Sequence, residues 1–87
     1  MRNILFSAEA FEQYLFWQQS DQNMLKKLNR LLVECMRTPS EGTGKPERLR
    51  GNLAGAWSRR ITQEHRLVYR VSEEAVIVVS CRFHYEK

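Results

Sequence analysis

The hydrophobic period of the sequence changes once, at the segment TPSEGTGKP (residues 38–46), and this change limits what the chain can fold into. Ahead of the segment, Leu25, Leu28 and Leu32 recur at helical spacing with charged residues between them. That helix must stop before Pro39, because proline disfavours helical geometry in the residue before it. Behind the segment, apolar and polar residues alternate with the period of two that half-buried strands show. Helices followed by strands predict an α+β fold.

The N-terminal part predicts one strand and two helices. The apolar segment NILF stops at Ser7, a good N-cap, and Glu9 follows in the first turn, where it complements the helix dipole. A first helix over residues 8–19 is predicted from the helical spacing of Phe11, Tyr14, Leu15 and Gln18, and its aromatic side chains are expected to face the core. Ser20 is expected to cap the second helix.

The C-terminal part predicts an antiparallel sheet of three or four strands, with both helices packed on one face. In WSRRIT, alternation puts Trp57, Arg59 and Ile61 on one face, and a tight QEH connection with His65 as a turn residue leads into the strand RLVYRV. The segment AVIVVSCRFHY predicts a last strand that continues to Tyr85. Its core side is expected to carry Ile77, Val79, Cys81, Phe83 and Tyr85, and its opposite side Val76, Val78, Ser80, Arg82 and His84.

Size and composition are those of a single folded domain over residues 1–87. A chain of 87 residues suffices for one hydrophobic core, and a hydrophobic fraction of 43% argues against disorder. Cys35 and Cys81 have no metal-binding spacing; as residues in apolar segments they favour buried thiols, with one disulfide as the alternative. No apolar run is long enough to span a bilayer and no signal peptide is evident, so a cytoplasmic protein is expected.

Positive charge is concentrated in one part of the chain. The net charge is +4, yet residues 45–70 hold seven lysines and arginines against only Glu47 and Glu64. A polyanionic partner such as nucleic acid is therefore expected. The alternative is that these side chains only form a solvated strand surface.

The predicted polar face of the sheet carries residue types that can cleave RNA. Arg60, Arg66, Arg82 and His84 are expected on it, with Glu47 at its rim. Cleavage without a metal needs a base for the 2′-hydroxyl, an acid for the departing 5′-oxygen and positive charge beside the phosphorane. Glutamate, histidine and arginine suit these three tasks. From the pattern alone, an ordinary strand histidine is still the commoner explanation of such a residue, and core packing that of both tryptophans.

The same segments resemble the YoeB-type toxins of the RelE/ParE superfamily, which are the toxin halves of bacterial toxin–antitoxin pairs. The resemblance rests on GKPE, NLAGAWSRRI, EHRLVY and the late HY, with YLFWQQSD near the N-terminus, and covers nearly the whole chain. It implies a microbial-ribonuclease-like α+β fold. It also implies an endoribonuclease that cuts mRNA in the ribosomal A site without a metal or another cofactor.

The resemblance also implies a role for individual residues. Glu47 would be the general base, His84 the general acid, Arg66 the group that stabilises the phosphorane, and Tyr85 a residue that positions the scissile nucleotide. Phosphate or ribosomal RNA would be bound by Lys45, Arg50, Arg59 and Arg60, with Glu64 supporting an arginine.

The implied partners are a cognate YefM-like antitoxin, the 70S ribosome with its mRNA, and a second copy of the chain in a homodimer; no membrane is expected. A gyrase-inhibiting toxin without nuclease activity is the alternative within the superfamily. A basic RNA-binding module without catalysis is a further alternative outside it.

Overall fold

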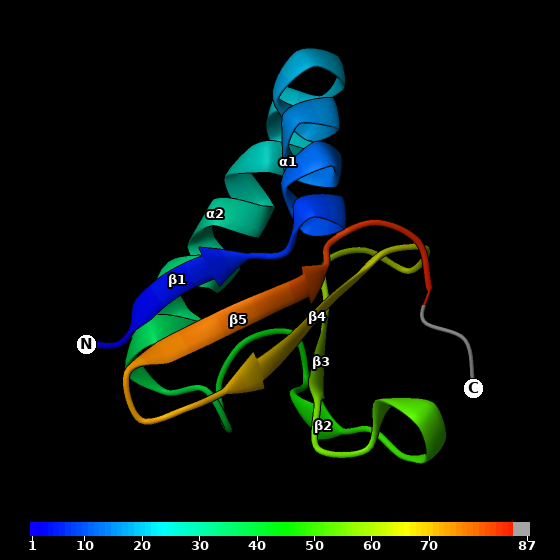
Figure 1. Ribbon diagram of the computed structural model, residues 1–87. Helices are drawn as coiled ribbons and strands as arrows, with labels where there is room; N and C mark the ends of the chain where they lie inside the picture. The colour runs from blue at the N-terminus through cyan, green and yellow to red at the C-terminus, as the bar shows by residue number, and fades with distance from the viewer. Residues whose placement is uncertain (85–87) are drawn as a thin grey trace.

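The computed structural model describes residues 1–84, in which two helices lie on one side of a five-stranded mixed sheet (Figure 1). The elements are β1 (Asn3–Phe6), α1 (Ala8–Ser20), α2 (Gln22–Arg37), β2 (Glu47–Arg48), the 3-10 helix η1 (Gly51–Leu53), β3 (Trp57–Arg60), β4 (Arg66–Val71) and β5 (Ala75–Ser80). The strand order is β1-β5-β4-β3-β2, with β1 parallel to β5 and all other neighbours antiparallel. The predicted α+β fold class is confirmed, but the sheet has five strands rather than three or four, because β1 joins the antiparallel strands in parallel.

The two helices begin at polar caps, one of which differs from the prediction. Ser7 caps α1 by accepting a hydrogen bond from the Ala10 amide at 3.0 Å, as expected. Ser20, however, is the last residue of α1, and Asp21 caps α2 by accepting from the Met24 amide at 3.1 Å. Asp21 has an extended backbone, so the same residue ends one helix and starts the next.

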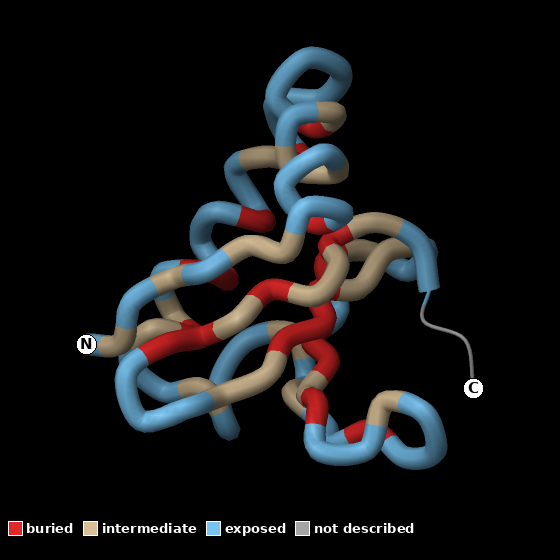
Figure 2. Tube along the Cα trace, in the orientation of Figure 1, coloured by how far each residue is buried: buried red, intermediate tan, exposed pale blue. Residues whose placement is uncertain are grey.

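The main core lies between the helices and the sheet, and Figure 2 shows that buried stretches gather on the strands and the helix sides facing them. Trp17 belongs to this core and Trp57 packs against it half-buried, which confirms their packing role. The buried members are Ala10, Trp17, Met24, Leu28, Leu31, Leu32, Cys35, Ile61, Leu67, Tyr69, Val76, Val78 and Cys81.

The face assignment and the length predicted for the last strand are wrong. Val76 and Val78 are fully buried against the helices, while Val79 lies on the opposite face of the sheet. There it packs with a second apolar cluster formed by Leu49, Leu53, Ala56 and Val68. The segment is apolar on both faces, so alternation could not show which face the helices cover. The strand also ends at Ser80, and residues 81–84 form a turn that we call the C-terminal turn.

Both cysteines are free and buried, in agreement with the expected thiols. Burial raises the pKa of the Cys81 thiol to about 12, so the thiolate is scarce at neutral pH. Within residues 1–84, no group of His, Cys, Asp and Glu side chains could hold a metal ion. None of the helices described is long and apolar enough to cross a membrane.

Candidate active site

A hollow of about 100 Å³ brings together four of the charged residues that the sequence singled out. Strand pairing explains this, because Glu47 lies opposite Ser58 and Arg60 lies opposite Arg66, and paired residues share a face of the sheet. That face is the one turned away from the helices. The lining residues are Gly44, Lys45, Glu47, Ser58, Arg60 and Arg66, and we call this the Glu47 hollow.

Three cations and one carboxylate thus meet in the Glu47 hollow. Lys45 and Glu47 come from the loop and the short edge strand β2, whereas Arg60 and Arg66 come from the facing ends of β3 and β4. The surplus of positive charge suits an anionic phosphate, and the carboxylate can accept a proton beside it. This arrangement can perform acid–base chemistry on a phosphodiester.

The loop that carries Lys45 and leads to Glu47 is held by a close contact between its backbone and that of β3. The Arg60 amide donates to the Gly44 carbonyl at 2.7 Å, and Gly44 has φ +86. A Cβ at this position would lie 2.8 Å from the Arg60 carbonyl oxygen, so only glycine fits without displacing β3. Lys45 follows, also in the left-handed region with φ +50. The TPSEGTGKP segment is therefore an anchored loop.

Arg59 does not line this surface, and the prediction that it binds RNA is wrong. Its side chain has no exposed area. Its Nε donates to the Tyr69 hydroxyl at 3.0 Å, and its Nη1 contacts a Glu34 carboxylate oxygen at 2.8 Å. Alternation puts Arg59 on the face of Trp57 and Ile61, which is the face that the helices cover.

The buried guanidinium instead holds the loop that leads to the Glu47 hollow. It donates to the carbonyls of Thr38, Glu41 and Thr43 at 2.5, 2.8 and 3.2 Å. Glu34 completes the anchor by accepting from the Thr43 amide at 2.5 Å, a hydrogen bond that lowers the pKa of the Glu34 carboxyl, helped by Arg59. The loop is thus tied to the interior just before Lys45 and Glu47.

Arg66 and His84 meet at one backbone oxygen. Arg66 Nη1 donates to the Gln63 carbonyl at 3.1 Å, and His84 Nε2 lies 3.0 Å from the same oxygen. Arg66 also donates to the Thr62 and His65 carbonyls at 2.8 and 3.3 Å. The structure therefore places the histidine beside an arginine of the Glu47 hollow.

His84 itself lines a second hollow of about 350 Å³, together with Val68, Val79 and Phe83 among others. Strand β4 joins the two hollows, since Arg66 lines the first and Val68 the second. Arg82, expected on the polar face, turns toward α1, and its guanidinium lies 3.6 Å from the centre of the Phe16 ring. Strand β5 ends before Arg82, so the alternation of side chains between the two faces of the sheet does not extend to this residue.

Besides Arg59 and His84, the predicted site residues Arg50 and Glu64 do not line the Glu47 hollow. Tyr85 lies outside the described residues. Arg50 is exposed just before η1, beyond the lining residues. Glu64 is exposed in the hairpin connection and, within residues 1–84, forms no ion pair with an arginine; the carboxylate bound to an arginine is that of Glu34.

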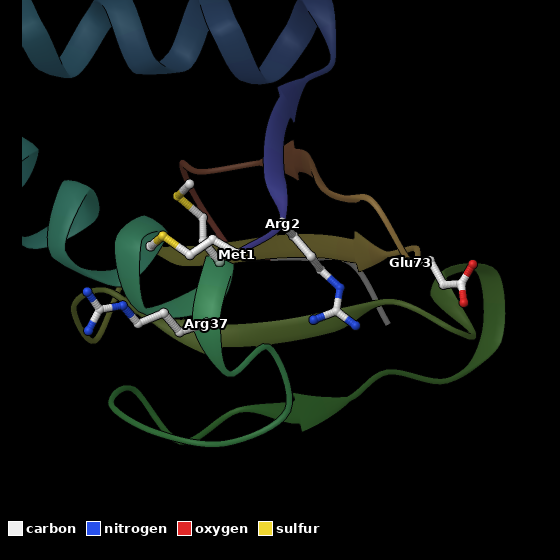
Figure 3. Close-up of a pocket in the computed structure, with 5 residues that line it drawn as sticks. Met1, Arg2, Arg37 and Glu73 are labelled. Atoms are coloured by element: carbon white, nitrogen blue, oxygen red, sulfur yellow. The ribbon is translucent and has the colours of Figure 1, made fainter.

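A larger hollow of about 430 Å³ lies elsewhere, lined by Met1, Arg2, Met36, Arg37 and Glu73 (Figure 3). It contains none of the residues that the sequence singled out. Arg2 already donates from Nε to the Ser72 carbonyl at 2.8 Å. The volume of a hollow is therefore a poor guide to the active site here, because this larger hollow lacks the residues suited to acid–base chemistry.

Sequence reasoning missed two residues that organise the site. Glu34 is one of several charged residues spaced along α2, and nothing in the pattern separates it from its neighbours. His65 was expected to be a turn residue, but its ring is half-buried and contacts Trp17 edge-on at 4.9 Å between ring centres. The position of His65 in the sequence, just before a strand with alternating side chains, does not indicate a contact with Trp17, which is distant in the sequence.

The sequence is similar to known proteins over nearly its whole length. A family model described as "YoeB-like toxin of bacterial type II toxin-antitoxin system" matches residues 6–85. Toxin YoeB of Escherichia coli (strain K12) is 50% identical over 82 residues, which cover 94% of this chain and 98% of that protein.

Solved structures agree with the sequence comparison. The YoeB dimer from Staphylococcus aureus superposes with a TM-score of 0.89 at 50% identity, covering 97% of this chain and 98% of that one. A heterotetrameric YoeB-YefM toxin-antitoxin complex from the same organism also gives a TM-score of 0.89 at 50% identity, over 98% of this chain and 99% of that one. Both relatives share the fold over nearly their whole length.

Proposed function

The chain belongs to the YoeB-like toxins of bacterial type II toxin–antitoxin systems, and from this premise we propose that it is an endoribonuclease that cleaves mRNA in the ribosomal A site. The observation that carries the proposal is the Glu47 hollow, where one carboxylate lies among Lys45, Arg60 and Arg66. Cleavage there needs no metal ion, because side chains supply the base, the acid and the positive charge. The result is inhibition of translation.

In the proposed reaction, Glu47 removes the proton of a ribose 2′-hydroxyl, and the resulting oxygen attacks the adjacent phosphorus. The phosphorane that forms carries negative charge, which Arg66 stabilises with Lys45 and Arg60. The bond to the 5′-oxygen then breaks, and His84 gives that oxygen a proton. The products are a 2′,3′-cyclic phosphate and a free 5′-hydroxyl.

The contact at Gln63 supports the assignment of the acid. His84 Nε2 and Arg66 Nη1 share the Gln63 carbonyl, so a phosphate bound to Arg66 would lie within reach of the imidazole after a small movement of the ring. Tyr85 follows directly in the sequence and would position the scissile nucleotide. Arg50 is exposed outside the hollow. It would contact either the mRNA away from the cleaved bond or the ribosome.

We also propose partners for this chain from those of its relatives. A YefM-like antitoxin would bind it, as YefM binds YoeB in the Staphylococcus aureus complex, and would cover the Glu47 hollow. A homodimer would form as in the Staphylococcus aureus YoeB dimer. The ribosome would be approached through the basic surface, by electrostatic attraction that weakens as salt rises. These proposals place the protein in the cytoplasm.

Mapping of mRNA 5′ ends in a purified translation reaction tests the activity. Addition of the protein should produce new ends confined to the A-site codon. Glu47→Gln and His84→Ala should each lower the cleavage rate by about 10²–10⁴-fold, as loss of a general base or acid does. Lys26→Gln, which removes a charge from an exposed position on α2, is the control and should cleave normally.

Three outcomes would contradict the proposal or part of it. Normal cleavage by either site variant would remove that residue from the mechanism. DNA damage in expressing cells with intact mRNA would favour the gyrase-inhibiting alternative, and binding of mRNA without new ends would favour a non-catalytic module.

A further inference from the structure

His65 connects the hairpin that carries Arg66 to the C-terminal turn that carries His84. Its Nδ1 accepts a hydrogen bond from the Phe83 amide at 2.7 Å. The Phe83 carbonyl in turn accepts from the Arg66 amide at 3.0 Å. Both backbone groups of Phe83 are thus bound by two consecutive residues of the hairpin. We propose that His65 is a positioning residue for His84, and that it acts through an unprotonated Nδ1 that holds the C-terminal turn.

The turn needs such a restraint because Phe83 has φ +67. An aromatic L-residue rarely adopts this left-handed conformation, since its Cβ crowds the backbone. The two hydrogen bonds offset that cost and fix the direction in which the chain leaves the turn. The next side chain is that of His84, whose Nε2 lies at the Gln63 carbonyl. Releasing the Phe83 amide would therefore move His84 away from Arg66.

His65 is itself held through both its ring and its backbone. Its edge packs on Trp17 of α1 at 78° between the ring planes. Its amide donates to the Thr62 hydroxyl at 3.2 Å, and its carbonyl accepts from the Ile61 amide at 3.0 Å. These contacts leave Nδ1 pointing at the turn. A residue whose only role was to connect β3 and β4 would not need its Nδ1 directed at the Phe83 amide.

The charge state of His65 decides whether the contact can exist. Burial has the largest effect and lowers the pKa of His65, the Glu64 carboxylate raises it, and electrostatic interaction with Arg82 and His84 lowers it. Glu64 acts from the same hairpin and Arg82 and His84 act from the C-terminal turn, while α1 presents the uncharged Trp17 ring. The neutral form therefore dominates at pH 7 and above. A protonated Nδ1 would be a donor facing the Phe83 donor, and acid would release the turn.

Nuclear magnetic resonance of the full ¹⁵N-labelled chain tests the contact without reference to activity. At pH 7.5 we expect a coupling across the hydrogen bond between the Phe83 amide nitrogen and His65 Nδ1. The coupling should disappear on acidification. Absence of the coupling, or a proton on His65 Nδ1 at pH 7.5, would overturn the inference.

Two His65 variants separate the acceptor atom from the ring. His65→Asn keeps an acceptor oxygen near the position of Nδ1 but loses the ring, whereas His65→Phe keeps a ring against Trp17 but has no acceptor. Misplacing His84 should lower kcat of His65→Phe by roughly 10- to 100-fold with KM unchanged, because the phosphate-binding cations stay in place. His65→Asn should stay within about threefold of the unchanged protein, since it keeps the hydrogen bond.

The outcomes distinguish this inference from the proposed function, on which it rests. If the unchanged protein cleaves mRNA and His65→Phe cleaves equally fast, only the role of His65 is lost. The same holds if His65→Asn is the more damaged variant, because ring packing then dominates. If the unchanged protein does not cleave mRNA, the proposed function fails and the catalytic role of His65 with it. Thermal unfolding of both variants shows that each is folded.

Discussion

Arg66 and His84 donate to one backbone oxygen, the Gln63 carbonyl, at 3.1 and 3.0 Å. The two side chains come from the start of β4 and from the C-terminal turn, and a main-chain group that no substitution can remove brings them together. Arg66 also lines the hollow that contains Glu47. Arg66 therefore links the proposed acid to the proposed base.

Arg66→Lys should nearly abolish cleavage although it keeps the charge. A single ammonium cannot reproduce the bonds of Nη1 to three carbonyls and also reach a phosphate with the planar geometry of a guanidinium. Loss of one group that stabilises the transition state costs about 10²–10³-fold in kcat, to be measured in single-turnover cleavage. Arg70→Lys on the same strand is the control and should cleave normally. Equal rates for both variants would remove Arg66 from the mechanism.

Arg59→Met should lower stability because it removes the partner of Glu34 and of three loop carbonyls. The loss should be about 2–4 kcal/mol, toward the lower end of values for broken buried pairs, because the Glu34 side chain is 28% exposed. Urea unfolding measures it. Arg60→Met, at the neighbouring exposed position, should change stability by less than about 0.5 kcal/mol yet reduce cleavage. The prediction fails if both variants unfold at the same urea concentration.

Gly44→Ala should displace the loop before Glu47. The new Cβ would combine a strained φ of +86 with a contact of 2.8 Å to the Arg60 carbonyl oxygen. Gly51→Ala is the matched control, because Gly51 also has a positive φ but a Cβ added there would have no atom within 4 Å. We expect about 1 kcal/mol of destabilisation in the control and more in Gly44→Ala, with loss of cleavage only in the latter. Similar effects at both positions would show that the close approach is unimportant.

Alkaline pH should destabilise the protein through two buried groups. Burial raises the pKa of the Cys81 thiol from 9.0 to about 12 and that of the Tyr69 hydroxyl from 10.0 to about 12. The folded state favours the protonated forms, so their contribution is complete below about pH 9 and is lost as the pH rises toward 12. Urea unfolding between pH 8 and pH 11 should show falling stability, with a shallower fall in Cys81→Ala. Parallel curves for the two proteins would exclude a contribution from this thiol.

Local chemistry in the sequence was enough to predict the element types and their order. The hydrophobic period, the helix caps and the proline after α2 each reflect interactions between residues close in the sequence. These features therefore predict a strand, two helices and antiparallel strands without tertiary information. The grouping of Arg60, Arg66 and Glu47 is likewise visible, because alternation puts the two arginines on the polar face and the loop ends beside it. Arg82 and His84, expected on the same face, do not line this hollow.

Only the tertiary structure decided which charges face solvent and which are buried. Arg59 and Arg60 are adjacent arginines, but one meets Glu34, Tyr69 and the loop carbonyls in the interior while the other lines the hollow. Val76 and Val78 face the helices, whereas Val79 packs with the segment around η1 on the opposite face. The place of His84 follows from the left-handed turn at Phe83, which His65 and Arg66 hold. The physical reason is common to all three: the free energy of a side chain in each position depends on partners distant in sequence, and a period of two carries no information about them.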